Sequence, residues 1–492
     1  MPEDYTALIE ELSREFRARN PRSAALDERA RAVMVDGGNH GVRLSHPFPP
    51  RIASARGGRV TDLDGHSILD FWQGHFANIL GNSPDVVAAA LSGAVAGGDT
   101  LLQLGIPDEL TVETAELLCP RLHTEKLRFT TSGTLATMYS IMLARAYTGR
   151  ELVLKVGGGW QGSQPWGLVG YALHPGPEPW TLDSEGLPSS VEGEVEISRF
   201  NDPEDLAARF RDHGDRIACM IVEPVVGAGE FMFGRPEYLG LARELTERYG
   251  ALLIFDEVVC GFRFRAGDVG SMYGLHPDLI TVGKVIGGGM PVAAFGGRAD
   301  VLDLCGRGGG NRVGASGGTY SAHPASLLAA RTMVSHLIEH EDEVYPRLAV
   351  LGERLRHAIE DGFAAGGIPA YSSGAPLAGI PGSSLTAVHF VLDEDAGPES
   401  PHESNDPSCC DVALKDGVLQ LALLLEGVYT LFGCFAVGTA HTEDDIDRVR
   451  DACEAVARRV AAHRRAGGPR VAVPGGASDP APSPGGDTSQ TR

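Results

Sequence analysis

The stretch Ala251-Leu-Leu-Ile-Phe-Asp256-Glu257-Val-Val, followed by Asp278-Leu-Ile-Thr-Val-Gly-Lys284-Val-Ile-Gly-Gly-Gly-Met-Pro, decides the fold. Both segments hold short apolar runs of the kind that form parallel strands buried on both faces. One run ends in the acidic pair Asp256-Glu257, and Lys284 follows the other in a glycine-rich turn. Ligands of open α/β sheets gather at the carboxyl ends of the strands, which is where we expect Asp256.

The same pattern extends outward from these segments. A third apolar run, Ile217-Ala-Cys-Met-Ile-Val-Glu223, precedes a helical pattern over residues 238–249. Strand-like and helix-like stretches alternate from about residue 100 to 330, which is typical of βαβ units. We therefore predict an α/β fold: a large domain with a mostly parallel sheet covered by helices, and a small α+β domain built from the N- and C-terminal parts.

Local patterns give the domain boundaries. Residues 1–35 show helical spacing of apolar residues, and an Asp-Gly dipeptide at 64–65 predicts a hairpin. Two further helices are expected at 348–363 and 444–463, the second capped by Thr442. The predicted parts are 1–95 (N-terminal segment, helix and hairpin, part of the small domain), 96–335 (large cofactor-binding domain), 336–465 (C-terminal small domain) and 466–492 (disordered tail).

The composition of the chain indicates which classes of partner are disfavoured and which cellular compartment is expected. The 492-residue chain has a formal net charge of −23, which disfavours nucleic acid and anionic membranes as partners. It has eight cysteines without a C-x-x-C pair, so we expect no zinc site and a reducing compartment. No signal peptide and no membrane-spanning apolar run is recognisable. These features predict a cytoplasmic protein without a resident metal.

Lys284 and Asp256 together indicate one cofactor, pyridoxal 5′-phosphate. Its aldehyde forms an imine with a lysine amine, and an aspartate pairs with its pyridinium nitrogen. Burial would lower the pKa of Lys284 and free the amine for imine formation and proton transfer. Asp256 could instead cap a helix or pair with Arg263, and Lys284 could be a surface lysine. We assign Glu257 a structural role.

Three more stretches are candidates for contact with this cofactor. Thr131-Ser132-Gly133-Thr134 follows a short strand and opens a helix, so its free amides predict a phosphate cradle, although a plain Ser/Thr cap looks the same. Gly317-Gly-Thr-Tyr-Ser321 is another small-residue turn, or an ordinary loop. Trp160 could lay a flat ring on the cofactor or pack in the core.

These motifs resemble the class III (ω-type) aminotransferases of pyridoxal phosphate fold type I. The nearest branch is that of glutamate-1-semialdehyde 2,1-aminomutases and β-phenylalanine aminotransferases. The resemblance spans roughly residues 35–465. Its most specific parts are Phe255-Asp-Glu-Val-Val-Cys-Gly-Phe-Arg263, Thr281-Val-Gly-Lys284-Val-Ile-Gly-Gly-Gly-Met-Pro291 and Gly317-Gly-Thr-Tyr-Ser-Ala-His-Pro324.

The resemblance implies a role for each matching residue. Lys284 is the Schiff-base lysine and Asp256 the partner of the pyridine nitrogen. The remaining implied contacts are Val258 on one ring face, Ser132, Gly133 and Thr134 at the phosphate, Trp160 in place of a stacking Tyr or Phe, Thr319 reaching the phosphate of a neighbouring subunit, and Arg43 at the substrate carboxylate. A homodimer with shared active sites follows from the role of Thr319. A solvated surface arginine is the alternative for Arg43.

Several positions depart from the family pattern. The family's Ser-Gly-Thr-Glu-Ala is Ser132-Gly-Thr-Leu135-Ala here, its Tyr-His-Gly is Trp160-Gln161-Gly162, and its Gly-His is Gly81-Asn82. The C-terminal stretch Gly427–His441 lacks the active-site Glu of the aminomutases. These changes leave the cofactor chemistry intact and bear on the substrate.

The predicted activity is that of an aminotransferase. It would move an amino group from an amino acid or amine donor to a keto or aldehyde acceptor through a Lys284 Schiff base, with ping-pong kinetics. The alternatives are an intramolecular 2,1-aminomutase, a racemase or decarboxylase on the same fold, and a non-catalytic pyridoxal phosphate-binding homologue.

Overall fold

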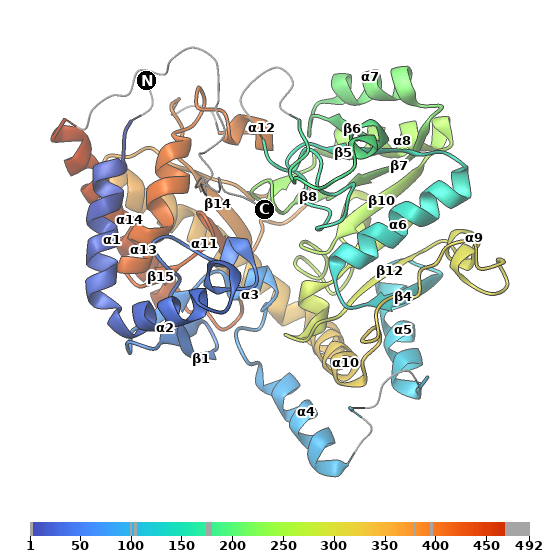
Figure 1. The fold of residues 1–492 in the computed structure, drawn as a ribbon, viewed down its shortest axis with the longest axis horizontal. Helices are drawn as coiled ribbons and strands as arrows, with labels where there is room; N and C mark the ends of the chain where they lie inside the picture. The colour runs from blue at the N-terminus through green and yellow to red at the C-terminus, as the bar shows by residue number, and fades with distance from the viewer. Residues whose placement is uncertain are drawn as a thin grey trace, which may run out of the picture.

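The computed structural model describes residues 3–98, 101–102, 106–173, 180–377, 379–393 and 397–467. Its largest sheet has seven strands in the order β4-β12-β11-β10-β7-β5-β6 (Figure 1). The strands are β4 Lys126–Thr130, β5 Leu152–Val156, β6 Val195–Ser198, β7 Ile217–Val222, β10 Leu252–Glu257, β11 Leu279–Val282 and β12 Ala293–Gly297.

This sheet confirms the predicted α/β class. The strand β12 is antiparallel to both its neighbours, β11 and β4, and the other strand pairs are parallel. Alternate residues of β7 and β10 enter two separate cores. Met220 and Leu253 pack with the helix α8 (Pro236–Tyr249), whereas Ile221 and Ile254 pack with α6 (Gly133–Thr148). Burial on both faces explains the continuous apolar runs.

The N- and C-terminal parts of the chain lie together, at the left of Figure 1. The N-terminal hairpin β2 (Arg59–Asp62) and β3 (Ser67–Asp70) is continued by β15 (Val428–Tyr429), which pairs in parallel with β3. The helix α1 (Thr6–Arg19) contacts α13 (Gln420–Leu425). The small part of the fold is therefore assembled from both ends of the chain.

The remaining secondary structure follows the predictions closely. Two helices, α1 and α2, divide the predicted N-terminal helical region at Pro21, and Thr442 caps the last helix in a capping box with Asp445. The main remaining elements are β1 Ile52–Arg56, α4 Asp85–Gly97, α5 Glu109–Arg121, α7 Pro203–His213, α10 Pro324–Glu339, α11 Glu341–Ala365, β13 Tyr371–Ser372, β14 Leu385–His389, α12 Pro401–Ser404, β16 Cys434–Ala436 and α14 Glu443–Arg465.

Two predictions on domain limits stay predictions. The boundaries at 95, 335 and 465 are not tested by the sheets alone, although the seven strands all fall between residues 126 and 297. The predicted disordered tail lies outside the described residues from 468 onward. Within the described ranges, no helix is long and apolar enough to cross a membrane.

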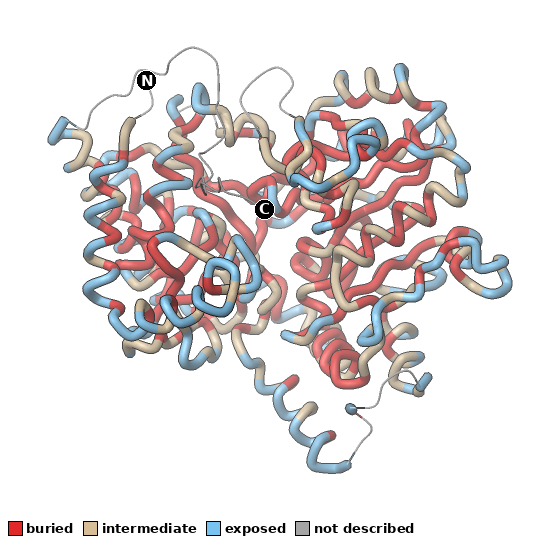
Figure 2. The backbone as a smooth tube through the Cα atoms, in the orientation of Figure 1, coloured by how far each residue is buried: buried red, intermediate tan, exposed pale blue. Residues whose placement is uncertain are grey.

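The helix α4 is largely exposed. It projects away from the body of the fold in Figure 1, and Figure 2 shows mostly exposed positions along it. Only Val87 and Ala94 of this helix are buried, and its apolar residue Val95 is 65% exposed.

Candidate active site

A cavity of about 1300 Å³ opens at the carboxyl edge of the seven-stranded sheet. Loops that follow β4, β5, β7, β10 and β11 meet there, as expected for an open α/β sheet. Its wall includes six of the predicted site residues, namely Arg43, Ser132, Gly133, Trp160, Val258 and Lys284. Asp256, Thr134 and Thr319 are not among the lining residues.

Lys284 stands in the turn directly after β11 and lines the cavity. Its backbone is held in the left-handed region at φ 46°, a conformation that costs a non-glycine residue roughly 1–3 kcal/mol and is common at functional sites. Burial lowers the pKa of the amine, against the opposing effect of Asp256 and Glu223. No side chain or carbonyl among the described residues hydrogen-bonds Nζ, so the amine is free to react.

Asp256 lies near the end of β10 and is 3% exposed. Its Oδ1 accepts a hydrogen bond of 2.8 Å from the hydroxyl of Thr281, the residue paired with it on β11, and one of 3.2 Å from the Val258 amide. Burial raises its pKa in spite of these bonds and of Lys284 nearby. The alternative pairing with Arg263 does not occur, because that guanidinium donates to the carbonyl oxygens of Phe76 and Val437.

Glu223 is a second buried carboxylate, one residue beyond β7, that the sequence reasoning did not assign to the site. Its Oε1 accepts the Trp160 amide at 3.1 Å and its Oε2 accepts the Gly227 amide at 2.9 Å. Burial and the nearby Asp256 raise its pKa. The signal was present in the sequence, since Glu223 ends an apolar run just as the Asp256-Glu257 pair does. Glu223 thereby fixes the two loops that carry Trp160 and Gly227 into the cavity wall.

Glu257 has the structural role predicted for it. Its carboxylate accepts the backbone amides of Val269 at 2.7 Å and Gly270 at 2.9 Å. It is fully buried and does not line the cavity.

The turn 131–134 forms the start of the helix α6 at the cavity. Ser132 caps α6, with its Oγ accepting the Leu135 amide at 3.3 Å. The positive end of the helix dipole and the free first-turn amides face the cavity wall. A Cβ on Gly133 would lie 2.8 Å from Cγ1 of Val258, so only glycine permits this approach of the two loops. Thr134 instead holds the neighbouring loop, since its hydroxyl accepts the Ser163 amide at 3.2 Å.

Trp160 lines the cavity and packs against a second aromatic ring. Its indole meets the ring of Tyr171 at a centroid distance of 4.6 Å and an interplanar angle of 70°. Both residues belong to the cavity wall. An aromatic pair thus lines the same cavity as Ser132 and Gly133, while Gln161, the next residue along, is buried.

Arg43 and Thr319 are the two predicted site residues on exposed segments. The Arg43 guanidinium lies 6.0 Å from the Trp72 ring centroid and makes no ion pair with any described residue. Thr319 is exposed in the loop 317–321, where the Gly318 amide donates to Ser321 Oγ at 3.1 Å. The structure therefore brings Arg43 to the cavity and leaves Thr319 facing outward.

The sequence reasoning missed a left-handed turn that carries His75 into the cavity. Gln73, Gly74, His75 and Phe76 all have positive φ values, between 49° and 67°. Left-handed backbone costs roughly 1–2 kcal/mol for each of the three non-glycine residues. Asp70 stabilises the turn, because its Oδ1 accepts the Gln73 amide at 2.9 Å and its carbonyl accepts Gln73 Nε2 at 2.6 Å.

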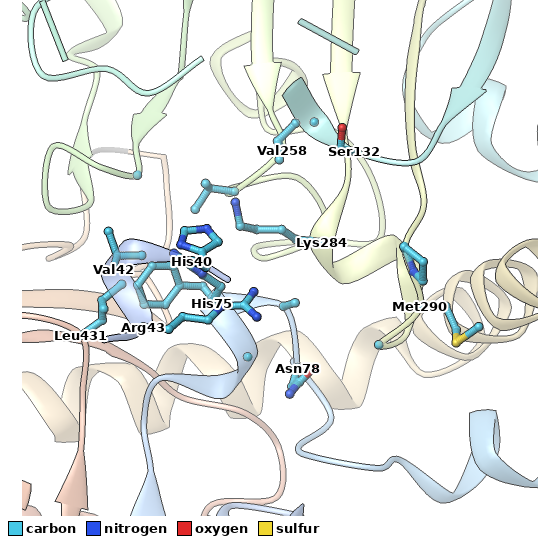
Figure 3. A pocket seen from close by; sticks show the side chains of 18 of the residues that line it. His40, Val42, Arg43, His75, Asn78, Ser132, Val258, Lys284, Met290 and Leu431 are labelled. Atoms are coloured by element: carbon cyan, nitrogen blue, oxygen red, sulfur yellow. The ribbon is translucent and has the colours of Figure 1, made fainter. Parts of the chain in front are cut away.

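His75 and His40 form one side of the cavity with Arg43. Their imidazole centroids are 5.1 Å apart, and Figure 3 shows Lys284 between them and the pair Val258 and Ser132. Burial is the main cause that lowers the pKa of His75 to about 3, and the nearby Lys284 is the second. Burial, with Arg43 and Lys284, also lowers the pKa of His40. Both imidazoles are therefore neutral at physiological pH.

This arrangement fits a phosphorylated aromatic aldehyde such as pyridoxal phosphate. The unpaired amine of Lys284 suits the aldehyde, the start of α6 suits the phosphate, and Val258 packs closely on Gly133 in the same cavity wall. The buried carboxylate of Asp256 lies behind Val258, where a cationic ring nitrogen would balance its charge.

Comparison with known proteins places the chain among related enzymes. The sequence profile of the family described as "Aminotransferase class-III" matches residues 42–362. A glutamate-1-semialdehyde 2,1-aminomutase from Akkermansia muciniphila is 34% identical over 443 residues, which cover 88% of this chain and 97% of that protein. One from Thermoplasma acidophilum is 34% identical over 350 residues, covering 69% of this chain and 78% of that protein.

Solved structures agree with the sequence comparison. An ω-transaminase from Sphaerobacter thermophilus matches with a TM-score of 0.80 and 30% identity, covering 89% of this chain and 98% of that one. A β-phenylalanine aminotransferase from Variovorax paradoxus matches with a TM-score of 0.79 and 30% identity, covering 94% and 99%.

Proposed function

On the premise that this chain belongs to the class III aminotransferase family, we propose a role for each side chain of its cavity. The protein is a pyridoxal phosphate-dependent enzyme of fold type I, and its activity is amino-group transfer. The observation that carries the assignment to this cavity is the unpaired, partly buried amine of Lys284 near the buried carboxylate of Asp256.

Lys284 and Asp256 are the proposed catalytic residues. Pyridoxal phosphate supplies an electron-withdrawing ring that stabilises the negative charge left when a proton leaves the substrate carbon. Lys284 is the residue that would hold the aldehyde. Because burial lowers its pKa, its amine can take that proton and return it at a second carbon. Asp256 would keep a proton on the ring nitrogen, and Thr281 holds its carboxylate in place.

The proposed cofactor-binding residues would hold the cofactor in place and take no part in proton transfer. Ser132, Gly133 and Thr134 would hold the phosphate at the start of α6. Val258 and Trp160 would lie against the faces of the ring. Glu223 is a positioning residue, because it fixes the Trp160 backbone through a 3.1 Å hydrogen bond.

Arg43 is the proposed substrate-binding residue. Its guanidinium faces the cavity without an anionic partner among the described residues, which suits the carboxylate of an amino acid donor or a keto acid acceptor.

We also propose that the protein is a homodimer with shared active sites. Large apolar residues are exposed around α4 and the start of α10, among them Leu102 at 81% and Tyr320 at 61%. Exposed apolar surface of this kind marks protein interfaces. Thr319 lies next to Tyr320 and would reach the phosphate in the second subunit. Sedimentation analysis tests this directly, and a monomeric holoenzyme would rule it out.

The proposed location is the cytoplasm. All eight cysteines are free thiols, and five of them are buried. A chain with this many unpaired cysteines suits a reducing compartment.

A 2,1-aminomutase is the second candidate function, since similar proteins bear that name. The two activities differ in their need for an acceptor. We expect the visible absorption band of the bound cofactor to shift with an amino donor, and to return only after pyruvate or 2-oxoglutarate is added. Product formation from glutamate-1-semialdehyde without any acceptor would favour the aminomutase. A band that no donor shifts would favour a non-catalytic binding protein.

A further inference from the structure

We infer that His75, carried by the left-handed turn Gln73–Phe76, determines specificity by hydrogen-bonding the carboxylate of a substrate held at Arg43. This inference rests on the proposed function of the cavity and names a recognition residue that the proposed function does not include. The ligand class is a substrate with a carboxylate close to its reacting carbon, either an amino acid donor or a keto acid acceptor.

The position of His75 is the first argument. Aromatic contacts connect the group: His75 lies 5.1 Å from His40 and 5.4 Å from Trp72, measured between ring centroids, and the Arg43 guanidinium lies 6.0 Å from the Trp72 ring. His40, Arg43 and His75 all line the cavity that Lys284 enters, and Figure 3 shows them on the same side of this lysine. A substrate between Lys284 and Arg43 would therefore pass His75.

The backbone gives the second argument. Strained left-handed residues persist only where the surroundings enforce them, and they cluster at functional sites. Here the buried Asp70 binds the Trp72 and Gln73 amides at 3.1 and 2.9 Å, and the buried Arg263 donates to the Phe76 carbonyl oxygen. Two buried charged residues, Asp70 and Arg263, therefore hold this turn in place. The turn thereby positions His75 in the cavity wall.

Charge gives the third argument. The groups that face His75 are the amine of Lys284, the imidazole of His40 and the guanidinium of Arg43. Among the described residues the cavity wall contains one carboxylate, Glu230, and that carboxylate already contacts Lys415 and His389. A wall with the Arg43 guanidinium and no free anion in this part of the chain suits an anionic ligand. The neutral imidazole then adds an N–H donor without adding repulsion toward Arg43.

The test compares two amines that differ in a carboxylate. The donors are β-phenylalanine and 1-phenylethylamine, and the variants are His75→Phe, which keeps a ring, and His75→Asn, which keeps a hydrogen-bond donor and tolerates left-handed backbone. We expect His75→Phe to lower the ratio of kcat/KM for the acid to kcat/KM for the amine at least tenfold, mainly through KM. His75→Asn should recover most of that ratio.

The controls separate this inference from the proposed function. His213→Phe on α7, away from the cavity, should leave the ratio unchanged. The cofactor absorption band shows that each variant is folded and loaded, and His75→Ala replaces His75→Phe if the latter fails to fold. A loaded protein whose ratio changes less than twofold in both His75→Phe and His75→Ala overturns the inference, as does a wild-type enzyme that accepts only carboxylate-free amines. A protein that never forms the band refutes the proposed function instead.

Discussion

The hydroxyl of Thr281 donates a 2.8 Å hydrogen bond to Oδ1 of Asp256 across the parallel strands β10 and β11. The two residues are directly paired in the sheet, and Lys284 follows Thr281 by three positions. The pair of strands β10 and β11 therefore positions the carboxylate of Asp256, and the turn after β11 carries the amine of Lys284. This relationship explains why both groups meet at one edge of the sheet, and it makes Thr281 a positioning residue that can be tested.

Replacing Thr281 by Val keeps the side-chain shape and removes the donor. The pKa of Asp256 should rise further, because the Thr281 hydrogen bond lowers it. Hydrogen bonds to charged groups contribute roughly 1.5–3 kcal/mol, so we expect kcat to fall at least about tenfold. The measurement is steady-state kcat together with the pH dependence of the cofactor band. Thr281→Ser should retain most activity, and an unchanged kcat in Thr281→Val would argue against the role of this bond.

Adding a methyl group at Gly133 should disturb the phosphate site. The new Cβ would lie 2.8 Å from Cγ1 of Val258, and overpacking of this kind costs typically about 1–3 kcal/mol. We expect Gly133→Ala to weaken cofactor affinity about tenfold or more, measured by fluorescence titration of the apoprotein. The double variant Gly133→Ala with Val258→Ala removes the clash and should recover part of the affinity. Equal affinities in all three proteins would contradict the assigned packing.

Acid should weaken the fold through Glu230. Burial alone raises its pKa, but His389 and Lys415 outweigh burial and lower the pKa from 4.5 to about 2. A depressed folded-state pKa stabilises the protein above the unfolded-state value, and this contribution is lost as pH falls from about 4.5 toward 2. It amounts to at most roughly 3 kcal/mol. Urea unfolding across this range should show a steeper loss for the wild type than for Glu230→Gln.

Removing the partner of Glu230 should cost more than removing the pair. Lys415→Met leaves a buried carboxylate with His389 alone, and breaking a buried pair destabilises by about 3–5 kcal/mol. The double variant Lys415→Met with Glu230→Gln should be closer to the wild type in its free energy of unfolding. A double variant less stable than Lys415→Met would contradict this expectation.

The strand ends could be predicted from the sequence because their signals are local. Continuous apolar runs identified β7 and β10, and the small-residue turn 131–134 identified the start of α6. The alternation of strand-like and helix-like stretches then predicted the α/β class. Asp256 and Lys284 followed, since each ends or follows a strand.

The left-handed turn could not be predicted because distant residues enforce it. Nothing within Gln73–Phe76 itself favours positive φ except Gly74, and the turn depends on Arg263, which is far along the chain. The placement of His75 is therefore a tertiary effect. The proposed role of Thr319 requires a second subunit, which a single sequence does not place.

The most direct test of the account is the identity of the residue that holds the cofactor. Protein loaded with pyridoxal phosphate is reduced with borohydride, digested and mapped by mass spectrometry. The matched variants are Lys284→Ala and Lys155→Met. Lys155 is the control because it is a second buried lysine whose amine interacts electrostatically with Asp256. The account predicts one modified peptide, labelled at Lys284 in the wild type and Lys155→Met and absent from Lys284→Ala. A label on Lys155 or any other lysine, or none at all, would contradict it.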